Sequence, residues 1–167
     1  MRTKFAAALR TALVCASLFA AGSAGAADPP VRAGVTITLP GLSYQVLSSG
    51  DPAGAHPTRA DGVAMRYVGR LTDGAVFSTS PGDGAEVSAF SVKEVIPGMS
   101  AILQLMRPGD SWRVTMPAYL AYGPGRPYTA PAATGATNGA VQRRAIPPDA
   151  TLVFDVELVA ILPPKAP

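Results

Sequence analysis

The chain has 167 residues, of which 48% are hydrophobic and 15% charged, and it contains one cysteine and one histidine. This length suits one domain with a modest core. The formal net charge of +3 comes from Arg2, Lys4 and Arg10, because the other 11 basic residues are matched by 11 acidic ones. The composition therefore does not indicate a partner made of nucleic acid, and a single cysteine excludes an internal disulfide.

Residues 1–26 are typical of a secretory signal peptide. Basic residues precede an apolar run that is too short to span a bilayer comfortably, and Ala24-Gly25-Ala26 is a small-residue cleavage site. The alternative is a retained N-terminal anchor. Because Cys15 lies in the apolar run, a processed chain has neither a thiol nucleophile nor a zinc-thiolate site. We expect a periplasmic or secreted protein with no membrane span after processing.

The first half of the remaining chain predicts strands. Residues 27–40 form an N-terminal extension without strong periodicity, and 48–61 read as a connecting loop that contains His56, expected to be solvated. Alternating apolar residues predict half-buried strands at Leu42, Tyr44 and Val46, and again at Val63, Met65, Tyr67 and Leu71. Thr72-Asp73-Gly74 is a hairpin signal, after which a return strand begins at Val76-Phe77 and resumes over 87–92.

The stretch 94–106 is the one persuasive helix of the processed chain. Its apolar residues have the spacing of a helix with one buried face, namely Val95, Ile96, Met99, Ile102, Leu103 and Met106. Pro97 suits the first turn, and Ser100 and Gln104 fall on the opposite face. A lone short helix is marginally stable unless strands cover it. The sequence therefore predicts a sheet folded around one helix.

Two further strands follow the helix, with an unusual loop between them. Alternation predicts one strand through Trp112, Val114 and Met116, and another through Leu152, Phe154, Val156 and Leu158. The loop 123–145 is crowded with small and turn-forming residues, and a loop of this length is usually functional or mobile. Residues 163–167 form a C-terminal tail.

Hydrolytic and metal chemistry have little support, because one loop histidine and no mature cysteine cannot build the usual constellations. An enzyme built from this sequence should need neither proton transfer nor a nucleophile. What remains is a set of apolar and aromatic residues at inward positions: Tyr67, Phe77, Phe90, Val95, Ile96, Trp112, Tyr122 and Phe154. Such a set is more often core packing, but apolar and aromatic residues also line ligand pockets, and the spacing does not decide between the two.

Several motifs carry a resemblance to a known family. They are Tyr67-Val-Gly-Arg-Leu71, Asp73-Gly-Ala-Val-Phe77, Glu94-Val-Ile-Pro-Gly98, Leu103-Gln-Leu-Met106, Leu120-Ala-Tyr-Gly123 and Ile146-Pro-Pro-Asp-Ala-Thr-Leu-Val-Phe-Asp-Val-Glu-Leu158. In this order they resemble an FKBP-type peptidyl-prolyl cis-trans isomerase of the secreted bacterial, Mip-like kind, over residues 41–162.

The resemblance implies an α+β fold in which an antiparallel sheet wraps around a short helix, with an apolar pocket for the proline of an X–Pro peptide. Catalytic positions carried over are Tyr67, Phe77, Ile96, Tyr122 and Phe154, and substrate-binding positions are Val95, Met99, Ser78 and Ile146. The Ile96 N–H and the Tyr122 hydroxyl would donate hydrogen bonds to substrate carbonyls. No cofactor or metal is implied, and the expected partners are proline-containing polypeptides and FK506-like macrolides.

Two positions depart from the family pattern: Ser78 stands where an aspartate is usual, and Met99 where a tryptophan usually forms the pocket floor. These departures favour weakened catalysis. The interpretations are thus an isomerase for exported proteins, a non-catalytic proline-peptide binder or chaperone, and a structural accessory of an envelope complex. Because the chain lacks the long N-terminal helices through which some secreted relatives dimerise, we expect a monomer.

Overall fold

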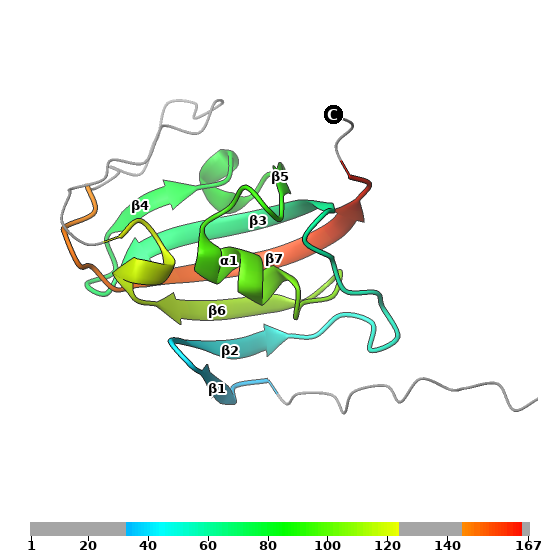
Figure 1. Ribbon diagram of the computed structural model, residues 1–167, viewed down its shortest axis with the longest axis horizontal. Helices are drawn as coiled ribbons and strands as arrows, with labels where there is room; N and C mark the ends of the chain where they lie inside the picture. The colour runs from blue at the N-terminus through cyan, green and yellow to red at the C-terminus, as the bar shows by residue number, and fades with distance from the viewer. Residues whose placement is uncertain (1–32, 124–144, 165–167) are drawn as a thin grey trace, which may run out of the picture.

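A computed structural model describes residues 33–123 and 145–164 of the chain. In these residues one antiparallel sheet of seven strands has the order β1-β2-β6-β7-β3-β4, with β5 also paired to β3. The strands are β1 (Thr36–Leu39), β2 (Leu42–Ser48), β3 (Gly62–Leu71), β4 (Val76–Thr79), β5 (Ser88–Ser91), β6 (Ser111–Met116) and β7 (Leu152–Leu162). Figure 1 shows the helix α1 lying across this sheet. The predicted α+β architecture is confirmed.

Alternating apolar residues explain why the central strands form and which way they face. In β7 the residues Leu152, Phe154, Val156 and Leu158 are buried, whereas Asp155 and Glu157 lie on the other face. β7 pairs with β6 on one side and with β3 on the other. Since successive side chains of a strand point to opposite faces, these strands present one apolar face toward the helix and one polar face outward.

The helix α1 (Pro97–Leu103) is held close to the sheet. Pro97 occupies its first turn, where the missing N–H costs no hydrogen bond. Met99, Ile102 and Leu103 are buried in the core. A Cβ atom on Gly98 would lie 2.7 Å from Met116 Sδ and 3.1 Å from the Leu120 carbonyl oxygen, so a larger residue here would require its neighbours to move. The helix therefore covers the apolar face as predicted, although it is shorter than the apolar stretch 94–106.

The outer edge of β3 is shared by two short strands. β4 pairs with its C-terminal half and β5 with its N-terminal half, and a 3-10 turn (Gly82–Gly84) lies between them. This agrees with the predicted interruption of the return strand. In β4 the residues Phe77, Ser78 and Thr79 are all buried, so the expected period of two fails there. The pairing of β3 with β4 has a register shift, which places an extra residue in β4.

One expectation from the sequence is wrong, and the structure adds detail to two others. Ser100, expected on the face of the helix opposite the apolar one, is only 6% exposed. The segment 27–40, which lacks strong periodicity, contains β1, which pairs with β2. His56 is exposed, as expected, and its Nδ1 also lies 3.1 Å from the carbonyl oxygen of Met106. The predicted signal peptide and most of the loop 123–145 lie outside the described residues.

Within the two described ranges, no helix has both the length and the hydropathy needed to cross a bilayer.

Candidate proline-binding site

An apolar cavity of about 210 Å³ lies between the sheet and the start of the helix. Its walls come from β3, β5, β7, the segment before α1, α1 itself and the segment after the 3-10 turn that follows β6. The lining residues are mostly apolar or aromatic, and they are Met65, Tyr67, Phe90, Glu94, Val95, Ile96, Met99, Tyr122 and Phe154. A concave apolar site with few polar groups is the usual form of a small-ligand pocket.

Aromatic contacts behind the lining hold its shape. Phe77 has no exposed surface, and its ring meets Phe154 edge-on at 5.4 Å and Tyr122 edge-on at 6.3 Å between centroids. Tyr67 meets Phe90 in a similar way at 5.8 Å. Edge-to-face pairs of this kind are favourable beyond their buried area. Phe77 thus supports two cavity walls from behind and does not itself face the cavity.

The polar groups at the cavity are few. The Tyr67 hydroxyl lies 3.1 Å from the Ser78 hydroxyl, and either can donate. The backbone N–H of Ile96 donates to no group found in residues 33–123 or 145–164, although the Ile96 carbonyl accepts from Ser100 N at 3.0 Å. Glu94 is the one carboxylate among the described lining residues, and no second acid or base lines the cavity beside it. The arrangement can bind and orient an amide.

Comparison with known proteins decides the family. Residues 54–159 match the model of the FKBP-type peptidyl-prolyl cis-trans isomerase domain. The chain belongs to the FKBP family. It is 41% identical over 131 residues to the FKBP-type 22 kDa peptidyl-prolyl cis-trans isomerase of Escherichia coli, covering 78% of this chain and 55% of that protein.

Two further likenesses support the same family. The outer membrane protein MIP of Legionella longbeachae is 35% identical over 130 residues, or 78% of this chain and 48% of that protein. The crystal structure of FkpA from Escherichia coli superposes with a TM-score of 0.61 at 34% identity, covering 79% of this chain and 53% of that one. The chain spans about half the length of the curated relatives that it matches.

The FKBP site residues expected from the resemblance fall into two groups. Six line the cavity, namely Tyr67, Val95, Ile96, Met99, Tyr122 and Phe154. The other three do not line it: Phe77 and Ile146 are buried, and Ser78 is 8% exposed behind the Tyr67 hydroxyl. The ring of Phe77 packs edge-on against Tyr122 and Phe154, two residues that do line the cavity.

Sequence reasoning missed three contributions to this FKBP site. Met65 and Glu94 line the cavity, and Glu94 was seen only as part of a motif. Gly69 was likewise only quoted in a motif, yet a Cβ there would lie 2.7 Å from Phe77 Cζ and 2.9 Å from Phe154 Cε1. The glycine lets the aromatic rings pack directly on the β3 backbone. Its position in a strand interior was the available signal.

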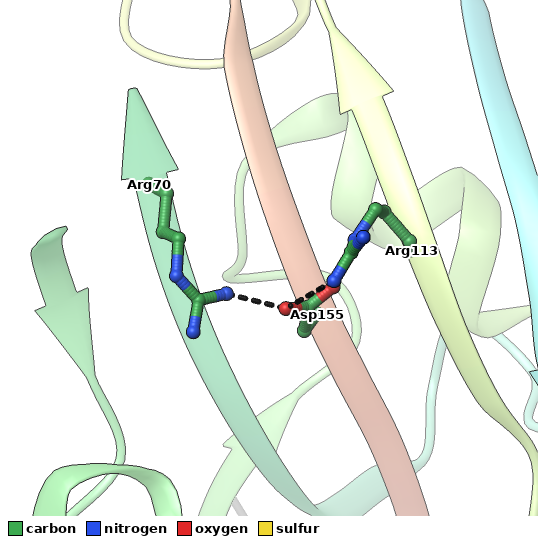
Figure 2. A network of polar contacts seen from close by, with 3 residues as sticks. All are labelled: Arg70, Arg113 and Asp155. Carbon is green, nitrogen blue, oxygen red and sulfur yellow. Dashed lines mark hydrogen bonds and ion pairs between the residues drawn. The ribbon is translucent and has the colours of Figure 1, made fainter. Parts of the chain in front are cut away.

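The face of the FKBP sheet away from the helix carries a charged network (Figure 2). Asp155 lies between Arg70 and Arg113, and Arg113 Nε is 2.6 Å from its Oδ1. Burial alone would raise the pKa of Asp155, but hydrogen bonds and charge, first from Arg113 and then from Arg70, outweigh burial and hold this pKa below its usual value. Hydrogen bonding to Asp155, with its charge, raises the pKa of Arg113.

Proposed function

We propose that the protein is a peptidyl-prolyl cis-trans isomerase that acts on X–Pro bonds of exported polypeptides. The observation that carries this proposal is the apolar cavity of about 210 Å³ lined by Tyr67, Ile96, Tyr122 and Phe154. It has a shape and polarity suited to a proline ring. Among the described residues, Glu94 is the one acidic side chain that lines it, and no nucleophile with an adjacent base lies there to support group-transfer chemistry.

Isomerisation of a prolyl bond is a reaction that such a site can accelerate. Rotation about a peptide bond faces a barrier of about 18–20 kcal/mol because resonance keeps the amide planar. The planar amide is more dipolar than the twisted one, so transfer into an apolar cavity disfavours the ground state relative to the twisted transition state. Each reduction of the barrier by about 1.4 kcal/mol gives a tenfold rate increase. No bond is broken, and no cofactor is required.

Hydrogen-bond donors at the rim would add selective stabilisation. In this proposal the Ile96 N–H donates to a substrate carbonyl and holds the peptide in register. The Tyr122 hydroxyl donates to a second carbonyl beside the proline. Donors that fit the twisted geometry better than the planar one lower the barrier, whereas equal binding to both lowers only KM.

A second candidate function is a proline-peptide binder or chaperone with little catalysis. It is favoured by Ser78 and Met99, which replace the aspartate and tryptophan expected at these positions. Ser78 still bonds Tyr67, but a hydroxyl offers no charge. Met99 lines the cavity and is a flexible side chain that adapts its shape. Such a floor retains affinity for proline while orienting the peptide less firmly.

The deciding experiment measures cis-to-trans conversion of a Leu-Pro peptide by residues 27–167. Tyr122→Phe should lower kcat/KM about five- to tenfold, as expected for loss of one hydrogen bond in the transition state. Tyr119→Phe is the matched control, because Tyr119 is 63% exposed and lines neither this cavity nor a neighbouring one. Peptide binding without acceleration, in a folded sample, would favour the binder. Competition by FK506 would test whether macrolides bind the same cavity.

We also propose that the protein acts in the periplasm, as a monomer. The basic and apolar leader at 1–26 supports export, and one relative is named as an outer membrane protein. Detection of the processed chain in an osmotic-shock fraction, with an N-terminus near residue 27, would support this location. Light scattering at several concentrations tests the monomer.

A further inference from the structure

A second hollow adjoins the proline-binding cavity. It has a volume of about 640 Å³ and is lined by residues from β3, β5, the end of β7 and the segment before α1: Gly62, Ala89, Phe90, Ser91, Glu94, Val95, Leu162, Pro163 and Pro164. We call it the flanking groove. Phe90, Glu94 and Val95 line both the cavity and the flanking groove. The two hollows therefore lie next to each other at these three residues.

Among the described residues, Glu94 is the one charged residue that lines either hollow. Its side chain is exposed, and no lysine or arginine in the described part of the chain pairs with it. Lys93 precedes it but lines neither hollow. The other carboxylates of the sheet behave differently, since Asp155 and Glu157 are each paired with arginine. Glu94 thus places an uncompensated negative charge where the two hollows meet.

We propose that the flanking groove binds the polypeptide segment next to the substrate proline, and that Glu94 selects a lysine or arginine in that segment. This inference rests on the proposed function, because the groove is assigned to the same chain whose proline enters the cavity. Phe90, Val95 and Leu162 contact the aliphatic stem of a long basic side chain, while its charged end lies at the Glu94 carboxylate. Long basic side chains bind in this divided way, with stems on apolar surface and charges in water.

The size of the effect follows from the exposure of Glu94. Exposed ion pairs are weak, so a lysine in the correct position should raise kcat/KM about two- to fivefold over alanine at low ionic strength. Salt screens exposed charges over distances of about 3 Å at 1 M ionic strength. The preference for lysine should therefore shrink strongly in high salt, while turnover of the alanine peptide changes little.

The experiment uses peptides with a Leu-Pro core and a single lysine, alanine or glutamate placed at each of the four positions on either side. Both kcat/KM for isomerisation and Kd by NMR titration are measured. In the wild type we expect lysine to exceed alanine, and alanine to exceed glutamate, at one or more positions. Glu94→Gln should abolish this order, and Glu94→Lys should invert it. Glu86→Gln is the matched control, because Glu86 is exposed and lines neither hollow.

A steric variant tests the groove independently of charge. Ala89 is exposed on β5 and lines the flanking groove but not the cavity, so Ala89→Trp should remove the lysine preference while a short Leu-Pro peptide is isomerised at the wild-type rate. Thr38→Trp is its control, since Thr38 is exposed and lines a separate hollow beside β1.

The outcomes separate this inference from the proposed function. Isomerisation without a lysine preference at any position overturns the role of Glu94 and leaves the isomerase intact, whereas binding with neither a lysine preference nor acceleration overturns the role of Glu94 and favours the binder. A lysine preference in Kd without acceleration supports Glu94 and overturns the isomerase. Neither binding nor acceleration in a folded sample overturns both. A preference that survives in Glu94→Gln assigns it to another group and overturns this inference.

Discussion

The hydroxyl oxygens of Tyr67 and Ser78 lie 3.1 Å apart, which joins a cavity wall to the buried edge of the sheet. Strand register explains the contact. Ser78 is opposite Gly69, and Tyr67 lies two residues before Gly69 on the same face, so Tyr67 and Ser78 are diagonal neighbours. Ser78 stands at the position where the FKBP pattern has an aspartate. The ring of Tyr67 therefore keeps a hydrogen-bond partner, but a neutral one.

Replacing Ser78 with aspartate should strengthen this link. A hydrogen bond from a hydroxyl to a carboxylate is roughly twice as strong as one between neutral groups, so Ser78→Asp should fix the Tyr67 ring more firmly and raise kcat/KM about three- to tenfold. Ser78→Ala is the comparison and should lower it. Thermal melts must accompany the kinetics, because an added carboxylate at an 8% exposed position costs stability. A stable Ser78→Asp protein with an unchanged rate would contradict the idea that this departure weakens catalysis.

Met99→Trp tests the cavity floor. Met99 is 3% exposed and lines the cavity. The empty volume of the cavity can accommodate the larger indole ring, which a filled core could not. A rigid aromatic floor should hold the proline ring in fewer orientations, with kcat/KM raised about threefold or more and KM lowered.

The measurement for Met99→Trp is the same peptide assay, with Met116→Leu as the control, because Met116 is a buried methionine that does not line the cavity. If Met99→Trp lowers the rate while the fold is retained, the methionine is an adaptation of the site and not a loss.

The sequence predicted those parts of the fold that depend on local periodicity. Leu152 to Leu158 alternates without a break, and β7 follows that alternation. The helix was likewise predicted from the spacing of Met99, Ile102 and Leu103, all of which are buried. Family motifs then placed Tyr67 and Tyr122 together, although they are far apart in the chain. Periodicity alone could not have done so, since it carries no information about which faces meet.

What the sequence did not predict depends on tertiary contacts. β1 has only four residues, Thr-Ile-Thr-Leu, and none of them is fully buried. Its alternation is too short to stand out in the sequence, and the strand pairs with β2. Phe77 was assigned to the pocket from the family motif, whereas its edge-on packing against Tyr122 and Phe154 depends on segments that are distant in the chain. Ser100 is polar and yet buried, because the helix is covered on more than its apolar stripe. Gly69 acquires its role only when two distant rings pack on it.

Gly69→Ala should disturb the site through packing. The new Cβ would lie 2.7 Å from Phe77 Cζ and 2.9 Å from Phe154 Cε1, so a ring or the strand must move. Overpacking of this kind costs about 1–3 kcal/mol of stability, and displacement of Phe154 from the cavity wall should also lower kcat/KM. Urea denaturation and the peptide assay measure the two effects.

The companion variant for Gly69→Ala is the double replacement Gly69→Ala/Phe77→Leu, in which a smaller side chain relieves the contact. A coupling energy of about 0.5 kcal/mol or more between the two sites is expected for residues in contact. Additive effects would show that the Gly69–Phe77 approach is not what restricts this position to glycine.

Asp155→Asn should destabilise the protein at neutral pH and spare its activity. Asp155 bonds Arg70 and Arg113 on the sheet face away from the helix, so we expect a loss of about 1–2 kcal/mol at pH 7 for the broken charged hydrogen bonds. Because these arginines lower the pKa of Asp155 in the folded protein, the unfolded chain takes up its proton first as the pH falls. The extra stability of the wild type over the variant is therefore complete well above the unfolded-state pKa of about 3.9 and declines from there toward the lower folded-state pKa.

Urea denaturation of both proteins between pH 7 and acid conditions measures this stability difference, with kcat/KM at pH 7 as the control. A stability difference that stays constant through the acid range would mean that the Asp155 charge contributes nothing and that the variant is destabilised by packing.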